Sequence, residues 1–175
     1  MKSNLVLVGF MGTGKTSLGR KLAKSLSKDF IDTDAEIEKI TGLSIPLLFK
    51  KHGEIRFRSE EKLVVKKAAE RDECVISTGG GVVLIPENIS ALSRKGWIIG
   101  LTASPEVIFA RVSKRSNRPL LYKKKSVEYI ENLLKQRESY YQCADITLDT
   151  SKLPPEELIT LILQFLMERG KNEKN

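Results

Sequence analysis

The sequence is poor in the residues on which zinc sites, disulfide frameworks and membrane spans depend. Its 175 residues include two cysteines, Cys74 and Cys143, and a single histidine, His52. The cysteines have no C-x-x-C spacing, so a Cys/His zinc site and a disulfide framework are excluded, and a reducing cytosol is expected. No run approaches the roughly 18 apolar residues of a membrane span, and the short apolar run before Gly9 lacks the form of a signal peptide. We therefore expect a cytoplasmic protein with no membrane partner.

Acidic residues are missing from one segment of the chain, and this absence explains the net charge. The whole chain carries 30 Lys and Arg against 22 Asp and Glu, a net charge of +8. Seven of these cations and no acid lie between Arg111 and Lys125, so the rest of the chain is close to neutral. A nucleic-acid-binding ATPase would use such a segment, but it offers only Tyr122 for base stacking. We expect no nucleic-acid partner, and we predict that Lys123, Lys124 and Lys125 lie in a solvated loop.

Short β-rich apolar runs alternate with helical patterns along the chain, without an internal repeat or a linker. Such alternation predicts an α/β domain in which helices cover a parallel sheet. The predicted strands are residues 5–8, 30–31, 74–77, 97–101 and 146–148. The predicted helices are residues 18–26, 35–41, 45–51, 54–69, 87–95, 126–142 and 155–169, with a further helix starting at 104–105. We expect a single domain over residues 1–170 and a frayed tail over 171–175.

One glycine-rich segment indicates a nucleotide. Residues 9–16, G-F-M-G-T-G-K-T, match G-x-x-x-x-G-K-[ST], a loop whose backbone N–H groups surround phosphates. A buried strand is predicted before it and an amphipathic helix after it, which is the context this loop requires. Lys15 can reach the β- and γ-phosphates, and the Thr16 hydroxyl can bind Mg²⁺. The expected nucleotide-binding residues of the loop are Gly12, Thr13, Gly14, Lys15, Thr16 and Ser17.

The loop does not identify the acceptor of the phosphoryl group, because ATPases, GTPases and small-molecule kinases all use it. The sequence has no N-K-x-D tetrapeptide and no downstream apolar strand that ends in an acid, so a metal-binding acid must come from elsewhere. Asp32 and Asp34 lie at the end of the second predicted strand, where the period-two alternation of a strand puts both side chains on one face, toward the phosphate loop. One could bind Mg²⁺ through water, and the other could orient or deprotonate a hydroxyl. Alternatively, Asp34 is the N-cap of the next helix.

Two arginines and a glycine triplet complete the candidate site. Gly79, Gly80 and Gly81 follow a buried strand and imply either close backbone approach or a flexible turn. Arg58 and Arg137 lie in predicted helices, where a lone arginine usually faces solvent. Together with an aspartate they would suit a small polyhydroxylated carboxylate, because the arginine fork binds a carboxylate with two hydrogen bonds.

Five motifs together resemble the shikimate kinase family. They are the phosphate loop, D-x-D at 32–34, G-E-x-x-F-R-x-x-E at 53–61, T-G-G-G at 78–81 and R-P-L-L at 118–121. They occur in the family's order, and the resemblance covers about residues 5–155. It implies a five-stranded, three-layer fold of the P-loop NTPase and nucleoside-monophosphate-kinase type. It also implies phosphorylation of the shikimate 3-hydroxyl by ATP, with one Mg²⁺ ion as cofactor, on the chorismate route to aromatic amino acids.

The resemblance further implies roles for individual residues. The catalytic residues would be Lys15, Asp34 and Arg118, with Arg118 on a mobile lid of about residues 112–125 that closes onto the phosphates. Mg²⁺ would be held by Thr16 and, through water, by Asp32. Shikimate would be bound by Asp34, Arg58, Gly79, Gly80, Gly81 and Arg137, with the two arginines on its carboxylate. Arg111 would stack on adenine, and residues 149–154, which end at Pro154, would form the adenine loop.

The closest alternative is another small-molecule P-loop kinase, such as a gluconate kinase or a nucleoside-monophosphate kinase. Such an enzyme would share the phosphate loop but would bind a different acceptor. We expect a monomer whose ligands are ATP and shikimate.

Overall fold

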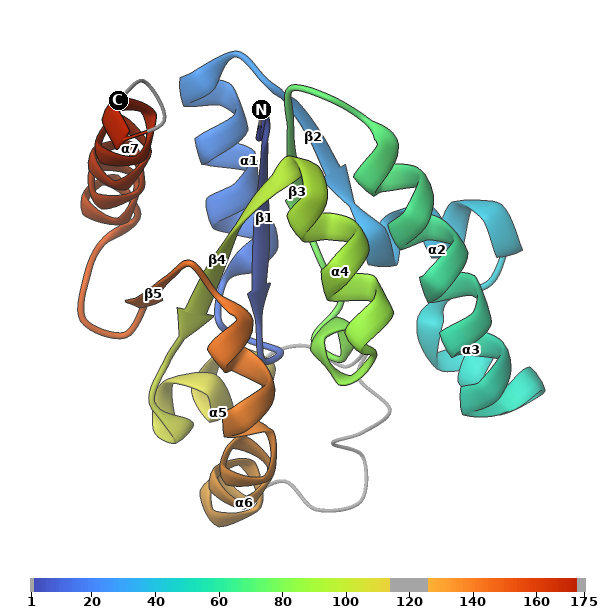
Figure 1. Ribbon diagram of the computed structural model, residues 1–175. Helices are drawn as coiled ribbons and strands as arrows, with labels where there is room; N and C mark the ends of the chain where they lie inside the picture. The colour runs from blue at the N-terminus through green and yellow to red at the C-terminus, as the bar shows by residue number, and fades with distance from the viewer. Residues whose placement is uncertain (1, 114–125, 173–175) are drawn as a thin grey trace.

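The computed structural model describes residues 2–113 and 126–172, and these form a parallel sheet of five strands in the order β2-β3-β1-β4-β5 (Figure 1). The strands are β1 (Asn4–Gly9), β2 (Asp29–Asp32), β3 (Cys74–Ser77), β4 (Gly96–Thr102) and β5 (Ile146–Asp149). The α-helices are α1 (Lys15–Leu26), α2 (Thr33–Thr41), α3 (Ile45–Glu70), α4 (Pro86–Lys95), α5 (Pro105–Ser113), α6 (Val127–Arg137) and α7 (Pro155–Asn172). Two 3₁₀ helices, η1 (Val82–Leu84) and η3 (Glu138–Cys143), complete the described elements.

Strand β1 is the middle strand of the sheet and is buried on both faces. Successive side chains of a strand point to opposite faces. Leu5 and Leu7 therefore pack in one cluster with residues of α1 and α7, whereas Val6 and Val8 pack in a second cluster with residues of α3 and α4. Helices thus cover both faces of the sheet (Figure 1), which confirms the predicted three-layer α/β architecture.

All five predicted strands form, each within one residue of its expected ends. Gly53 explains why the sequence suggested two helices where the structure has α3. Its backbone φ of 77° interrupts the helical geometry and lies in the left-handed region that favours glycine. The predicted break between residues 51 and 54 is therefore present as a kink inside one element.

The C-terminal ends of two helices differ by more than one residue from the sequence predictions. The helix predicted over 126–142 stops at Arg137 and tightens into the 3₁₀ helix η3, a common arrangement at helix ends. Helix α7 continues through Gly170 to Asn172, because a glycine lowers helix stability by only about 1 kcal/mol and does not by itself end a helix. Helix α7 therefore includes residues 171 and 172, which were predicted to belong to the tail.

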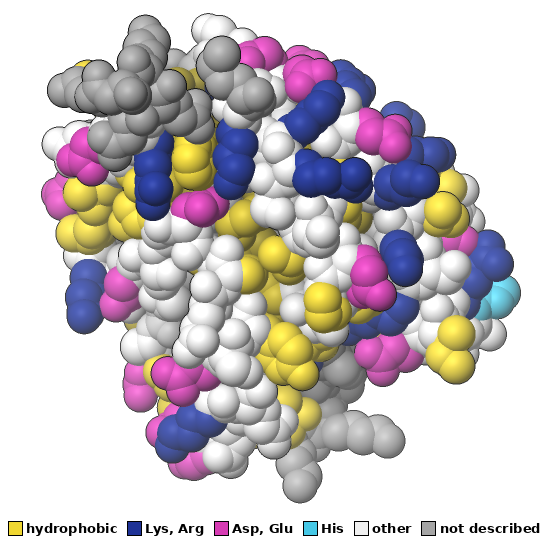
Figure 2. Space-filling model, viewed as in Figure 1, with side chains coloured by type: hydrophobic (Ala, Val, Ile, Leu, Met, Phe, Trp, Pro, Cys, Tyr) yellow, Lys and Arg dark blue, Asp and Glu magenta, His cyan; other side chains and the backbone are white. Residues whose placement is uncertain are grey.

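The described surface carries both signs of charge. In Figure 2, Lys and Arg side chains are interspersed with Asp and Glu across the face in view, as expected if most of the chain is close to neutral. His52 is exposed and directly precedes Gly53, where α3 is kinked. Among the helices of residues 2–113 and 126–172, none combines the length and apolar character that crossing a bilayer requires.

Asn4 joins the start of β1 to the turn before β3. Its side chain is buried, with 1% of its surface exposed. The Asn4 Nδ2 donates to the Arg71 carbonyl at 2.6 Å, and its Oδ1 accepts a hydrogen bond from the Cys74 N–H at 2.9 Å. This one amide therefore satisfies two backbone groups at the point where β3 enters the sheet.

We predict that Asn4→Ala lowers the free energy of unfolding by about 2–4 kcal/mol, because it leaves two backbone groups without their partner. Urea denaturation followed by circular dichroism measures this change. Ser3→Ala is the matched control: the Ser3 hydroxyl donates to Asp72 and accepts from the Glu73 N–H, each at 3.3 Å, but both contacts are exposed to water, so their loss should cost less than about 1 kcal/mol. Equal costs for the two variants would contradict the role assigned to Asn4.

Candidate active site

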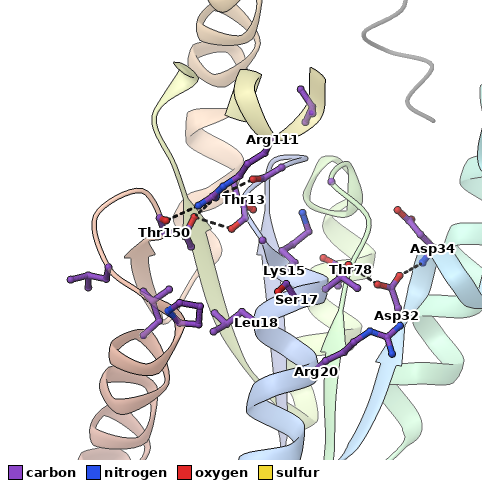
Figure 3. Close-up of a pocket in the computed structure, with 18 residues that line it drawn as sticks. Thr13, Lys15, Ser17, Leu18, Arg20, Asp32, Asp34, Thr78, Arg111 and Thr150 are labelled. Atoms are coloured by element: carbon purple, nitrogen blue, oxygen red, sulfur yellow. Dashed lines mark hydrogen bonds between the residues drawn. The ribbon is translucent and has the colours of Figure 1, made fainter. Parts of the chain in front are cut away.

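A pocket of about 730 Å³ opens at the carboxyl ends of the strands (Figure 3). Ligands of open α/β sheets bind at this edge, where the strand order changes direction. Its walls come from the phosphate loop and α1, the ends of β2 and β3, α5, and the segment that leads into α7. The lining residues are Gly12, Thr13, Gly14, Lys15, Thr16, Ser17, Leu18, Arg20, Asp32, Asp34, Thr78, Gly80, Arg111, Val112, Thr150, Leu153, Pro155 and Leu158.

The phosphate loop joins β1 to α1 at the base of this pocket. Gly12 and Gly14 have φ values of 80° and 93°, in the left-handed region that other residues rarely adopt. Gly14 is the N-cap of α1 and has no side chain with which to cap it. The first N–H groups of α1 and the positive end of its dipole therefore meet the pocket, which makes this end of the helix a site for anions.

Lys15 lies at the start of α1 and is largely buried, with 7% of its surface exposed. Its Nζ donates to the carbonyl oxygens of Gly9 at 2.7 Å and Phe10 at 2.9 Å. These contacts hold the ammonium group against its own loop. A phosphate bound by the loop would therefore meet a cation that is already in place.

Hydroxyl and carboxylate oxygens gather beside the start of α1. The Thr16 hydroxyl donates to Asp32 Oδ2 at 2.8 Å, and the Ser77 hydroxyl lies 3.5 Å from Thr16 Oγ1. Hard oxygen donors of this kind suit Mg²⁺, so the residues present fit that ion. Ser77 was not among the predicted residues, because the sequence search required an acid at the end of β3.

Asp32, and not Asp34, is the N-cap of α2. Asp32 Oδ1 accepts hydrogen bonds from the N–H groups of Asp34 at 3.1 Å and Ala35 at 3.3 Å. The strand thus ends at Asp32, and Asp34 lies in the first turn of the helix, so the prediction that both acids lie on one face at the end of the strand was wrong for Asp34. The structure nevertheless brings both carboxylates to the same pocket (Figure 3).

The glycine triplet lies against charged side chains from two helices. A Cβ added to Gly79 would come within 2.6 Å of Asp34 Oδ1, and one added to Gly81 within 2.6 Å of Arg58 Nη1. A Cβ on Gly80 would lie 3.1 Å from the Met11 nitrogen in the phosphate loop. Because glycine has no side chain, the triplet can contact both the predicted acceptor-binding residues and the phosphate loop.

Arg58 is held by two acids of its own helix. Its Nη1 donates to Glu61 Oε2 at 2.8 Å, and its Nη2 donates to Glu54 Oε1 at 3.2 Å. Glu61 is fully buried, and burial raises the pKa of its carboxyl group, which the Arg58 guanidinium partly opposes. Sequence reasoning gave Glu61 no role, although an acid three residues after an arginine in a helix is a recognisable pairing signal.

Arg137, the last residue of α6, lies beside Phe10 of the phosphate loop and Tyr141. Its guanidinium lies 5.5 Å from the centre of the Phe10 ring. The nearby Tyr141 hydroxyl donates to the Gly80 carbonyl at 3.4 Å, and burial raises the pKa of Tyr141 to about 12, with Arg137 opposing the rise. Tyr141 was not predicted; it links the segment after α6 to the middle glycine of the triplet.

Arg111 connects α5 to the phosphate loop. Its Nη1 donates to the Gly12 carbonyl at 3.2 Å and to Thr150 Oγ1 at 2.9 Å, and its Nη2 donates to the Thr150 carbonyl at 2.8 Å (Figure 3). These bonds lie in the plane of the guanidinium, whereas its face is the part that would stack on a base. Pro154 is exposed, and its neighbours Leu153 and Pro155 line the pocket.

Part of the predicted site lies outside the described residues. This part comprises Arg118, residues 114–125 of the predicted lid, and the lysines at 123–125. The remaining predicted residues are all described, and all of them except Arg137 and Pro154 line the pocket, belong to the glycine triplet or lie against it.

The chain is similar to shikimate kinases along nearly its whole length. The sequence model of the shikimate kinase family matches residues 11–167. A shikimate kinase of Pelotomaculum thermopropionicum is 52% identical over 167 residues, which are 95% of this chain and 97% of that protein.

Solved structures give the same result. A shikimate kinase from Acinetobacter baumannii in complex with shikimate has a TM-score of 0.91 and 36% identity, covering 97% of this chain and 95% of that one. A gluconokinase from Sinorhizobium meliloti covers 98% of this chain and 96% of its own, but at a TM-score of 0.59 and 16% identity it shares only the fold. These likenesses confirm the predicted P-loop kinase fold. A family match over residues 11–167, with a relative 52% identical across nearly the whole chain, shows that the chain belongs to the shikimate kinase family.

Proposed function

We propose that this protein transfers the γ-phosphoryl group of ATP to the 3-hydroxyl of shikimate, giving shikimate 3-phosphate and ADP. This reaction belongs to the chorismate route to aromatic amino acids. One observation carries the proposal: Asp34 and Gly80 line the same pocket as Lys15 and Thr16 of the phosphate loop. A nucleotide in the loop and an acceptor beside the glycine triplet would therefore share one cavity, in a chain of the shikimate kinase family.

The phosphates would be bound by the backbone amides of residues 12–17, by the dipole of α1 and by Lys15. Phosphoryl transfer leaves little covalent work to the protein, so positioning and neutralisation of charge are its main contributions. Arg118 would add a further positive charge at the transferring group, a role that rests on the sequence. Arg111 would stack on adenine beside Pro154 and its neighbours.

Thr16 would bind Mg²⁺ directly, and Asp32 would bind it through water. Once bound, the ion would neutralise negative charge on the phosphate oxygens. Two protein ligands suit Mg²⁺, which usually keeps several waters and takes further ligands from the nucleotide phosphates. The hydrogen bond from Thr16 to Asp32 at 2.8 Å supports this assignment, because it already holds the two oxygen donors together.

Shikimate would be oriented by protein groups that bind it at opposite sides of its ring. Arg58 and Arg137 would bind its carboxylate, and Asp34 would accept a hydrogen bond from the hydroxyl that is phosphorylated. Asp34 would hold that oxygen in line with the transferring phosphorus and would take its proton. The closeness of Gly80 to Met11 supports this arrangement, because it puts the acceptor side next to the phosphate loop.

The proposed setting is a single chain in the cytoplasm. The two cysteines are free thiols, which suits a reducing compartment.

We predict that the protein releases ADP from ATP in the presence of shikimate and not in the presence of gluconate or a nucleoside monophosphate. Omitting Mg²⁺ and adding EDTA should abolish the reaction. A coupled ADP-release assay with the three acceptors, checked by mass spectrometry of the phosphorylated product, measures this. Comparable turnover with gluconate or a nucleoside monophosphate would refute the proposed acceptor.

Arg58→Lys and Arg137→Lys should each raise the shikimate KM by about tenfold or more, because an ammonium cannot reproduce the two parallel hydrogen bonds of a guanidinium. The ATP KM should stay within about twofold, since neither arginine is assigned to the nucleotide. Arg56→Lys is the matched control: Arg56 lies on α3, the helix that carries Arg58, and it is exposed and pairs with Glu60. If Arg58→Lys or Arg137→Lys had the same shikimate KM as Arg56→Lys, the substituted arginine would not belong to the proposed substrate site.

Arg118→Ala should lower kcat by about a hundredfold, which is the usual effect of removing one donor that stabilises transition-state charge. The dissociation constant of shikimate should change much less, because Arg118 is assigned to the phosphates. Steady-state kinetics together with shikimate titration separate these effects. Lys124→Ala, in the same segment but predicted to be solvated, serves as the comparison. An unchanged kcat in Arg118→Ala would refute the role of Arg118.

A further inference from the structure

One side chain from the loop after β5 reaches the phosphate loop. The Thr150 Oγ1 lies 2.9 Å from the Thr13 carbonyl oxygen and 3.1 Å from the Thr102 carbonyl oxygen. It also accepts a hydrogen bond from Arg111 Nη1 at 2.9 Å. Figure 3 shows this group at the edge of the pocket, with Arg111, Thr13 and Thr150 turned toward one another.

The hydroxyl of Thr150 has one proton, and the surrounding contacts direct it to Thr13. Arg111 can only donate, so the proton must point away from the guanidinium. The Thr102 carbonyl already accepts the Thr150 backbone N–H at 2.8 Å and lies farther from the hydroxyl than the Thr13 carbonyl does. The hydrogen bond received from Arg111 also makes the hydroxyl a stronger donor.

The Thr13 carbonyl is a sensitive point of the phosphate loop. In a trans peptide the C=O and the following N–H point in opposite directions, so fixing the Thr13 carbonyl also fixes the Gly14 N–H. Gly12 and Gly14, on either side of Thr13, both have left-handed backbone conformations. Because glycine has no Cβ, their backbones can also adopt other conformations, so a contact is needed to fix the peptide between them. The Thr13 hydroxyl bonds to Phe10 inside the loop at 2.8 Å, whereas Thr150 supplies a contact from another element.

We propose that Thr150 is a positioning residue for the nucleotide: its hydroxyl fixes the peptide between Thr13 and Gly14 so that the Gly14 N–H faces a bound phosphate. Arg111 strengthens this contact by holding the Thr150 hydroxyl and carbonyl at the same time. The inference rests on the nucleotide-binding part of the proposed function. It concerns the donor side of the pocket and predicts no effect on the acceptor side.

The test compares Thr150→Val and Thr150→Ala, which lose the hydroxyl, with Thr150→Ser, which keeps it. Calorimetric titration with ADP and Mg²⁺, without shikimate, should show about three- to tenfold weaker binding for Val and Ala, the loss expected for one hydrogen bond. Thr150→Ser should bind ADP within about twofold of the unaltered protein, and the shikimate KM should stay within about twofold throughout. Thr160→Val is the control, because Thr160 is exposed on α7 and bonds only within its helix, to the Glu156 carbonyl.

Three results would overturn the inference: unaltered ADP binding in Thr150→Val, equal weakening in Thr150→Ser, or loss of folding in both Val and Ala variants. The last result would assign the hydroxyl to the stability of the fold, and thermal unfolding of each variant detects it. ADP binding is measured without an acceptor, so the titration decides the role of Thr150 independently of the reaction. A protein inactive toward shikimate would refute the proposed function but would not affect that test.

Discussion

The burial of β1 on both faces is the constraint on which the rest of the structure depends. Its four apolar residues between Leu5 and Val8 anchor both helix layers, so the strand cannot shift without disturbing two clusters of the core. The chain leaves this strand at Gly9, where any Cβ would overlap the Leu101 carbonyl of the neighbouring strand. The phosphate loop starts at that tight point and returns directly into α1. The geometry of the core therefore also determines the geometry of the anion site.

The acceptor side of the pocket is attached to the same strand by backbone bonds. The Thr78 N–H and hydroxyl both donate to the Leu7 carbonyl, at 3.2 and 2.9 Å, and the Gly79 N–H donates to the buried Thr33 hydroxyl at 3.0 Å. The glycine triplet is thereby fixed to β1 and to the start of α2. The phosphate loop is the direct continuation of β1. The sheet therefore sets the distance between this loop, the proposed nucleotide site, and the glycine triplet, the proposed acceptor site.

Sequence reasoning succeeded where a signal is local and failed where two distant segments meet. The strands, the phosphate loop and the kink at Gly53 follow from runs of apolar residues or from glycine. The start of α2 was misjudged, because the Asp32 side chain caps the helix and ends the strand there, and the period-two pattern of a strand gives no sign of such capping. Thr150 meets Thr13 across 137 positions, so no spacing rule reaches that pair. Glu61 was within reach, because its distance from Arg58 is a helical turn.

The surroundings of Arg58 would hold its guanidinium firmly and still leave it able to bind the proposed substrate. Its contact with Glu61 is buried, whereas Glu54 has 63% of its side-chain surface exposed. An exposed ion pair contributes little, since water and salt screen it, but removing the partner of a buried charge costs several kcal/mol. A carboxylate arriving from solvent would therefore replace Glu54 and leave Glu61 in place. The raised pKa of Glu61 reflects the cost of burying its charge, and the Arg58 guanidinium offsets part of that cost. The buried pair with Glu61 thus fixes the direction of the Arg58 side chain. The exposed pair with Glu54 can be broken, so the other nitrogens of the guanidinium are available to a ligand.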